Sequence, residues 1–288
     1  MNQIPLQNIE LPRGFVARNR YLVLRRLVQA SVLCLFLLGP WFSLWILRGN
    51  LSSSVLFNTV PMTDVFSFLQ MLFAGHWPEL TAVLGVLVVA GFYVVAGGRA
   101  YCAWVCPINP VTDLAAWLRE KLSIKQHMRI SRQFRIWVLA AVLLVTLFAG
   151  SVVYEYVNPV SHAYRLVIFA SLGSIWFVAG VFLFDLLISR RGWCGHVCPM
   201  GVVYAQLGKL SPLKVAALDR QQCDDCMDCY KVCPEPQVIK PALKGEAKGV
   251  SPVILDSDCT LCARCIDVCD KHVFSFSSRF AHLAEKSL

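Results

Sequence analysis

Long apolar stretches alternate with short polar ones over much of the chain. Four of these stretches approach the length of about 20 residues that a helix needs to cross a bilayer, and they occupy residues 27–47, 80–97, 136–153 and 166–188. A fifth, at residues 65–73, is too short to cross and is expected to lie at the membrane surface between the first two. The pattern therefore predicts a membrane all-α bundle of four transmembrane helices.

The distribution of lysine and arginine predicts the orientation of this bundle. Five arginines precede the first apolar stretch and seven basic residues lie between the second and third, whereas the other two loops carry one each. Because basic loops stay in the cytoplasm, we expect a multi-pass protein of the bacterial inner membrane with both termini cytoplasmic. Arg25 and Arg26 could instead mark a twin-arginine export signal, but the long apolar stretch without a small-residue cleavage site favours a retained helix.

Composition agrees with a membrane protein and changes the interpretation of the net charge. Apolar residues make up 57% of the chain and charged residues 16%, which departs from soluble domains in both directions. A net charge of +9 would suit a nucleic-acid partner, but the basic residues flank apolar stretches instead of forming one stripe. We therefore expect membrane lipid, and no nucleic acid, among the partners.

An internal repeat follows the second and the fourth apolar stretch. The chain has RAYCAWVCPINPV from Arg99 and RGWCGHVCPMGVV from Arg191, with an arginine, an aromatic residue and a CxxxCP motif at identical spacing. This predicts two related helical hairpins that bring together four thiols, those of Cys102, Cys106, Cys194 and Cys198. Two interpretations stay open: an additional redox or cluster site, or thiols that support helix ends and the neighbouring domain.

The C-terminal part contains the pattern CxxCxxCxxxC twice. Thiolates at every third residue let a loop surround one cubane, while the fourth cysteine ligates the other cluster. This predicts two [4Fe-4S] clusters, one held by Cys223, Cys226, Cys229 and Cys269 and the other by Cys259, Cys262, Cys265 and Cys233. A pair of four-cysteine zinc sites is the alternative. Cys34, alone in an apolar stretch, is expected to be a packing residue.

These features divide the chain into four parts. We expect an N-terminal cytoplasmic arm at residues 1–26, a transmembrane domain at 27–189 with a cytoplasmic loop at 98–135, a linker with the second CxxxCP motif at 190–215, and a small α+β ferredoxin-like domain at 216–288. Short strands are predicted in the last part at residues 238–239, 253–255 and 273–276.

Several of these segments together resemble the NapH/MauN-like family of membrane polyferredoxins. The likeness rests on GPWFSLWIL in the first apolar stretch, CPINPVTDLAAWLR after the second, FLFDLL before WCGHVCPMG, and CMDCYKVCPEP in the C-terminal part. The resemblance implies a component of a quinol dehydrogenase rather than a complete enzyme. It would take electrons from quinol and pass them, with a NapG-type iron–sulfur subunit and a NapC-type multihaem cytochrome, towards periplasmic nitrate reductase.

Quinol oxidation also requires a proton acceptor near the end of an apolar stretch. The candidates are Asp64, His76, Asp113, Glu155, His162, Asp185 and His196. Asp185 ranks first because it lies within an apolar stretch, but none is assigned as the catalytic base. Two other functions remain open: a membrane polyferredoxin for maturation or regulation of a periplasmic metalloenzyme, which the arm of only 26 residues disfavours, and an anchor whose clusters serve folding alone.

Overall fold

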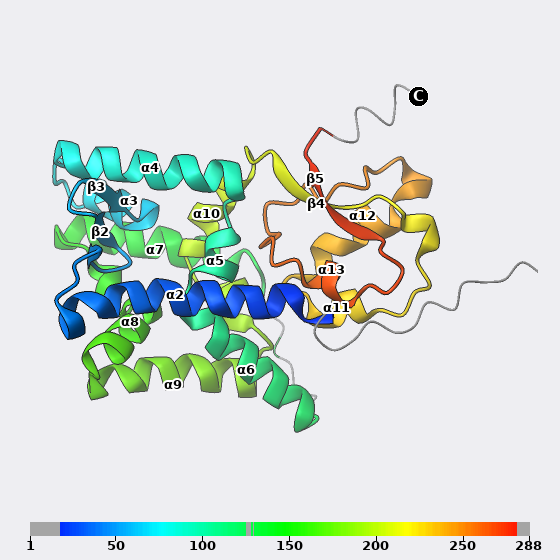
Figure 1. Ribbon diagram of the computed structural model, residues 1–288, viewed down its shortest axis with the longest axis horizontal. Helices are drawn as coiled ribbons and strands as arrows, with labels where there is room; N and C mark the ends of the chain where they lie inside the picture. Colours follow the sequence, from blue (N-terminus) through cyan, green and yellow to red (C-terminus); the bar gives the residue numbers. More distant parts are fainter. Residues whose placement is uncertain (1–17, 125–127, 129, 281–288) are drawn as a thin grey trace, which may run out of the picture.

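The protein consists of a helical part and a smaller C-terminal module, and one long helix of the helical part reaches the module with its N-terminal end (Figure 1). The computed structural model describes residues 18–124, 128 and 130–280, so most of the expected N-terminal arm lies outside the described residues. The helical part contains α2 (Arg20–Phe42), α3 (Val65–Phe73), α4 (Leu80–Ala96), α5 (Ala100–Trp104), α6 (Ile108–Lys121), α7 (Phe134–Ala149), α8 (Pro159–Phe169), α9 (Ile175–Leu183) and α10 (Met200–Gly208).

A small antiparallel sheet closes the end of the helical part that lies far from the module (Figure 1). Its strands are β1 (Leu47–Gly49), β2 (Ser53–Leu56) and β3 (Val60–Thr63), in the order β1-β2-β3. Strand β3 packs directly on α4, because a Cβ atom at Gly85 would lie only 2.6 Å from Oγ1 of Thr63. The Asp64 side chain then accepts a hydrogen bond from the N–H of Ser67 and so caps α3.

The prediction of four transmembrane helices, and with it two membrane-spanning hairpins, is wrong. Within the described residues one helix is long and apolar enough to cross a membrane, namely α2 with 23 residues. Helices α4 and α7 have 17 and 16 residues. The stretch at 166–188 is broken where Ala170 adopts a left-handed conformation (φ 49°), which ends α8 before α9 begins. Apolar composition alone therefore overestimated helix length, because it does not show where the backbone turns.

The C-terminal module is an α+β unit with a two-stranded sheet. Strand β4 (Leu213–Ala217) pairs antiparallel with β5 (Phe274–Ser278). Of the three short helices of the module, α12 (Ile239–Lys244) and α13 (Arg264–Val268) contact the sheet, and α11 (Asp228–Val232) packs against α13. Of the predicted strands, the one at 273–276 overlaps β5, the one at 253–255 contributes a single bridge from Val253 to Ala216, and residues 238–239 are helical. The core contains apolar side chains together with cysteine thiols, including those of Cys229 and Cys265.

Two buried arginines connect the helical part to the module. Nη1 of Arg99 lies 2.9 Å from Oε1 of Glu235 and 3.0 Å from the carbonyl oxygen of Asp258. Nη2 of Arg135 lies 2.5 Å from Oδ1 of the same Asp258. Because all four side chains are largely withheld from water, each charge depends on its partner.

The module also holds the first turn of α2. The backbone N–H groups of Tyr21 and Leu22 donate to the buried carboxylate of Asp267, at 3.1 and 3.2 Å. Arg18 pairs with Asp228 at 2.8 Å. A carboxylate at a helix N-terminus is favoured by the unpaired N–H groups and the helix dipole, so the N-terminal end of α2 is held on the module.

Candidate iron–sulfur centres

The two CxxCxxC loops have the same backbone conformation at equivalent positions. In the first loop Asp225 and Met227 are left-handed, with φ of 60° and 64°. In the second loop Leu261 and Ala263 occupy the same two positions relative to the cysteines, with φ of 49° and 57°. Residues other than glycine rarely adopt this conformation, and in proteins a left-handed residue beside a right-handed one turns successive N–H groups to one side. Such loops suit sulfur-rich anionic clusters.

The structure brings together the thiols that the doubled spacing assigns to each cluster. One cavity is lined by Cys223, Cys226, Cys229 and Cys269. In the second set, Cys233 interacts electrostatically with Cys259 and Cys262, and Cys265 with all three of these. Helices α11 and α13, which precede Cys233 and Cys269, pack against each other. Ligation of iron by these eight cysteines, with the fourth ligands exchanged, stays a prediction.

Two of the module's thiols are protonated in the absence of iron and would lose their protons on binding a cluster. Burial raises the pKa of Cys229 and of Cys259 to about 11 each, so without iron both are protonated at neutral pH. The N–H groups of Tyr230 and Leu261 donate to these two sulfurs, and such hydrogen bonds stabilise a cluster thiolate. In the described part of the chain, no group of three or more His, Cys, Asp or Glu side chains is placed to hold a single metal ion.

The four repeat cysteines also converge. Cys102, Cys106, Cys194 and Cys198 line one small cavity. Cys106 and Cys198, the second cysteine of each motif, accept hydrogen bonds from the N–H groups two and three residues later, at the starts of α6 and α10. The two repeats thus present a sulfur atom to the cavity with the same local geometry.

The surroundings of this four-thiol site are largely apolar. Besides the thiols, the cavity is lined by Tyr101, Trp193 and several aliphatic residues. Burial raises the pKa of Cys102 to about 11, against the neighbouring charge of Arg99, which favours the thiolate. A five-residue π-helix, Trp193–Val197, carries Cys194, and such π-turns are frequent at functional sites.

Comparison with known proteins gives matches over every arrayed cysteine. Residues 79–125 match a family described as a 4Fe-4S binding domain, and residues 191–239 and 222–273 each match a 4Fe-4S dicluster domain. The ferredoxin-type protein NapH of Haemophilus influenzae is 46% identical over 272 residues, 94% of each chain. NapH of Escherichia coli is 45% identical over 269 residues, 93% of each chain. The methylamine utilization ferredoxin-type protein MauN of Methylorubrum extorquens is 46% identical over 268 residues, 93% of this chain and 92% of MauN.

This chain belongs to the NapH/MauN family of ferredoxin-type proteins. The expected family resemblance is confirmed, and the chain is an iron–sulfur electron-transfer protein. No solved structure matches it. Because 4Fe-4S domain matches include both CxxxCP motifs as well as the module, the predicted count of two clusters does not follow from the comparisons.

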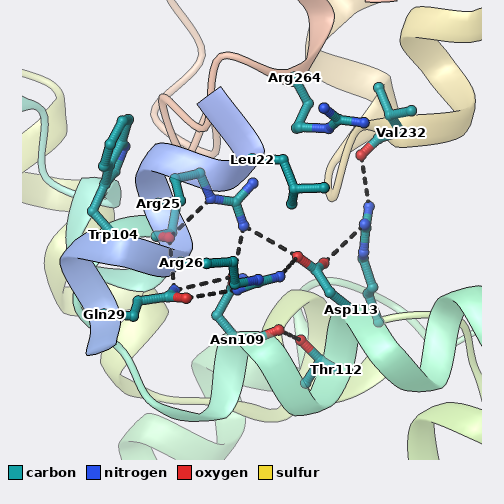
Figure 2. Close-up of polar contacts among 12 residues, drawn as sticks. Leu22, Arg25, Arg26, Gln29, Trp104, Asn109, Thr112, Asp113, Val232 and Arg264 are labelled. Atoms are coloured by element: carbon teal, nitrogen blue, oxygen red, sulfur yellow. Dashed lines mark hydrogen bonds and ion pairs between the residues drawn. The ribbon is translucent and has the colours of Figure 1, made fainter. Parts of the chain in front are cut away.

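In this NapH/MauN-family chain, an arginine network holds the first CxxxCP segment (Figure 2). Asp113 on α6 forms ion pairs with Arg25, Arg26 and Arg191. Burial acts to raise the pKa of Asp113, but the three guanidinium groups hold it below its ordinary value. Nε of Arg25 donates to the carbonyl oxygen of Ala103, inside the first motif, at 3.0 Å. The arginine pair considered as an export signal therefore fixes α2 against the first repeat.

The candidate proton acceptors fall into different surroundings. Asp185 is fully buried and accepts a hydrogen bond from the N–H of Trp193 at 2.9 Å, beside the second CxxxCP motif. Asp64 accepts one from the hydroxyl of Tyr204 at 2.6 Å. His76 contacts the carbonyl oxygen of Gly150, and Glu155 accepts a hydrogen bond from the Ser52 hydroxyl. The His162 ring stacks on Phe177. His196 is half-buried near Glu235. The hydrogen bond between Asp64 and Tyr204 could not have been found from spacing, because the two lie far apart in the chain.

Proposed function

We propose that this protein is a membrane-attached subunit that takes electrons from quinol and passes them, with a NapG-type iron–sulfur partner and a NapC-type multihaem cytochrome, towards a periplasmic nitrate reductase. The observation that carries the electron-transfer role is the pair of equivalent left-handed loops with converging thiols. The donor and partners rest on family likeness, in which relatives named NapH and MauN are about equally similar.

In this proposal the module holds two [4Fe-4S] clusters with the ligand sets predicted from the sequence. When bound, such clusters accept and release single electrons. The chain's own residues orient N–H groups towards the sulfurs and exclude water with the buried core formed by Val215, Ile239 and Val273. Lower solvent access and hydrogen bonds to sulfur are the means by which a protein sets a cluster potential.

We assign a third iron–sulfur centre to the four-thiol site. Its cavity is small and largely apolar, four sulfurs line it, and equivalent backbone N–H groups donate to one sulfur from each repeat. A direct contact leads from this site to the module, because Nε1 of Trp104, between the first two cysteines, lies 3.0 Å from the carbonyl oxygen of Leu261 in the second loop.

Helix α2 attaches the protein to the membrane, with the module on the cytoplasmic side. Arginines are concentrated in and before the first two turns of α2, at the end that the module holds, and such residues favour the cytoplasmic face. Large apolar side chains such as Phe92, Trp137 and Trp176 are exposed on other helices. Exposed apolar surface of this extent is suited to contact with lipid.

Added quinol is expected to reduce the clusters when the partner subunit is present. Membranes containing the protein and its NapG-type partner would be treated with menadiol or decylubiquinol and examined by low-temperature EPR. Reduced-cluster signals should appear with at least one quinol, and dithionite provides the total that can be reduced. If dithionite generates the signals but neither quinol does, quinol is not the donor, and a maturation or regulatory role becomes the better explanation.

Iron and sulfide analysis is expected to show three cubanes, or about twelve iron atoms per chain. Cys198→Ser should lower this number by about four, because it removes one ligand of the four-thiol site. Cys34→Ser is the matched control, since this exposed cysteine lies outside every array and should leave the iron content unchanged. About eight iron atoms in both the wild type and Cys198→Ser would show that the repeat thiols hold no cluster.

A further inference from the structure

A larger cavity lies beside the four-thiol site, with Tyr101 lining both. Its volume is about 360 Å³. Side chains of α2, α4, the β1–β3 sheet, α5 and α10 surround it, and most of them are apolar, including Val32, Phe36, Val89, Phe92 and Val105. The cavity therefore suits a largely apolar ligand of small-molecule size.

One wall of this cavity carries a buried acid and a phenol. The hydroxyl of Tyr204 donates to Oδ1 of Asp64 at 2.6 Å, and the N–H of Ser67 donates to Oδ2 at 2.8 Å. Asp64 is 4% exposed and Tyr204 is 1% exposed. Burial raises the pKa of the Asp64 carboxyl above its ordinary value, although both hydrogen bonds oppose the change. A buried carboxylate of this kind is a stronger proton acceptor than one at the surface.

Tyr101 supplies a hydrogen-bond donor that the described residues leave unused. Its ring stacks on the ring of Tyr204, with the two ring centroids 4.7 Å apart and an angle of 3° between the ring planes. Its hydroxyl is buried and has no hydrogen-bond partner among the residues that the structure describes. Buried hydroxyl groups in proteins are normally paired, so an acceptor atom on a ligand in the adjoining cavity would complete the site.

We infer that this cavity binds the ring of a quinol, an inference that rests on the proposed function and locates its donor site. The Tyr101 hydroxyl donates to one ring oxygen, and the Asp64 carboxylate accepts a hydrogen bond from a quinol hydroxyl. The apolar side chains of α2 and α4 cover the hydrocarbon tail. A lipid acyl chain would fill the apolar volume but offers no acceptor for Tyr101.

The arrangement also accounts for the protons and electrons of the reaction. Conversion of one quinol to its quinone breaks two O–H bonds and releases two electrons and two protons. The iron–sulfur centres proposed above, when bound, would accept these electrons one at a time, and Tyr101 directly precedes the cluster-site residue Cys102 in the chain. Asp64 takes the first proton and passes it to water before it takes the second.

Asp64→Asn is expected to slow quinol-driven cluster reduction about 100-fold, the usual contribution of a positioned general base, with no change in reduction by dithionite. Asparagine still caps α3, since its side-chain oxygen can accept a hydrogen bond from the Ser67 N–H. If Asp64 served only as this cap, Asp64→Asn would therefore reduce the clusters at the wild-type rate. Tyr204→Phe keeps the stacked ring but removes a hydrogen bond that holds the pKa of Asp64 down, so the pH below which quinol-driven reduction slows should move upwards. Glu79→Gln is the control, because Glu79 is exposed at the N-cap of α4 and makes no capping bond.

Binding is tested separately from electron transfer. An azido-ubiquinone photolabel should attach to residues of α2, β1–β3, α4, α5 or α10 in the full-length protein in membranes, and excess decylubiquinone should prevent it. Labelling elsewhere, labelling that excess quinone fails to prevent, or an Asp64→Asn rate equal to wild type would overturn this site while leaving quinol as donor. Labelling at these segments without any quinol-driven reduction would support the binding site and exclude the donor role.

Discussion

Cys265→Ser is expected to empty both clusters of the module, whereas Cys226→Ser should empty only one. Cys265 is buried in the module core beside the thiols of its own set and of Cys229, on the helix that packs against α11. Without its cluster, Cys265→Ser leaves a serine hydroxyl in the core beside the empty volume of the cluster. Both are among the larger sources of destabilisation. Cys226 is exposed at the edge of its loop, so its loss leaves the core packing intact.

The difference between these two variants can be measured by iron content and EPR. Cys226→Ser should lose about four iron atoms and one signal, and Cys265→Ser about eight iron atoms and both signals. If Cys265→Ser retains the other cluster, the two loops fold independently of each other. If neither variant loses iron, the ligand sets derived from the spacing are wrong.

The local features of the cysteine loops could be predicted from the sequence. The CxxCxxC spacing restricts three thiols to one short loop, and the equivalent left-handed residues at 225, 227, 261 and 263 show that both loops follow the same path. The sequence also shows an arginine three residues before the first cysteine of each CxxxCP motif. It does not show the ion pairs of these arginines, because Arg99 pairs with Glu235 and Arg191 with Asp113, and both partners lie in distant segments.

Changes of backbone direction inside apolar sequence could not be predicted from the sequence. The stretch at 27–47 ends in strand β1 because Ser43 turns left-handed after α2 (φ 57°), and Gly150 ends α7 in the same way (φ 59°). Strand β4 could not be predicted locally, because its partner β5 lies about sixty residues later in the chain. Elements defined by tertiary pairing leave a weak local signal. The quinol cavity has the same origin, since α2, α4 and α10 meet only in the folded chain.

Arg99→Met is expected to be the most destabilising change outside the cysteines, at about 3–5 kcal/mol. Arg99 is 1% exposed and is bonded to Glu235, to the carbonyl oxygen of Asp258 and, at 3.2 Å, to that of Cys194. Its removal leaves the Glu235 carboxylate buried, with Arg132 as the nearest remaining cation, 3.5 Å from Oε2. Because Arg99 joins the helical part, the four-thiol site and the module, loss of stability should appear as loss of clusters on heating.

The equivalent arginine of the second repeat is the matched control. Arg191→Met removes one of three cations around Asp113, so Asp113 stays paired and the loss should be about 1 kcal/mol. Thermal bleaching of the cluster absorbance in the purified full-length protein would rank the variants as wild type, Arg191→Met and then Arg99→Met. Adding Glu235→Gln to Arg99→Met should recover part of the loss, since the unpaired buried charge is removed. Equal melting of the two single variants, or no recovery in the double variant, would show that the buried pair does not hold the module against the repeat.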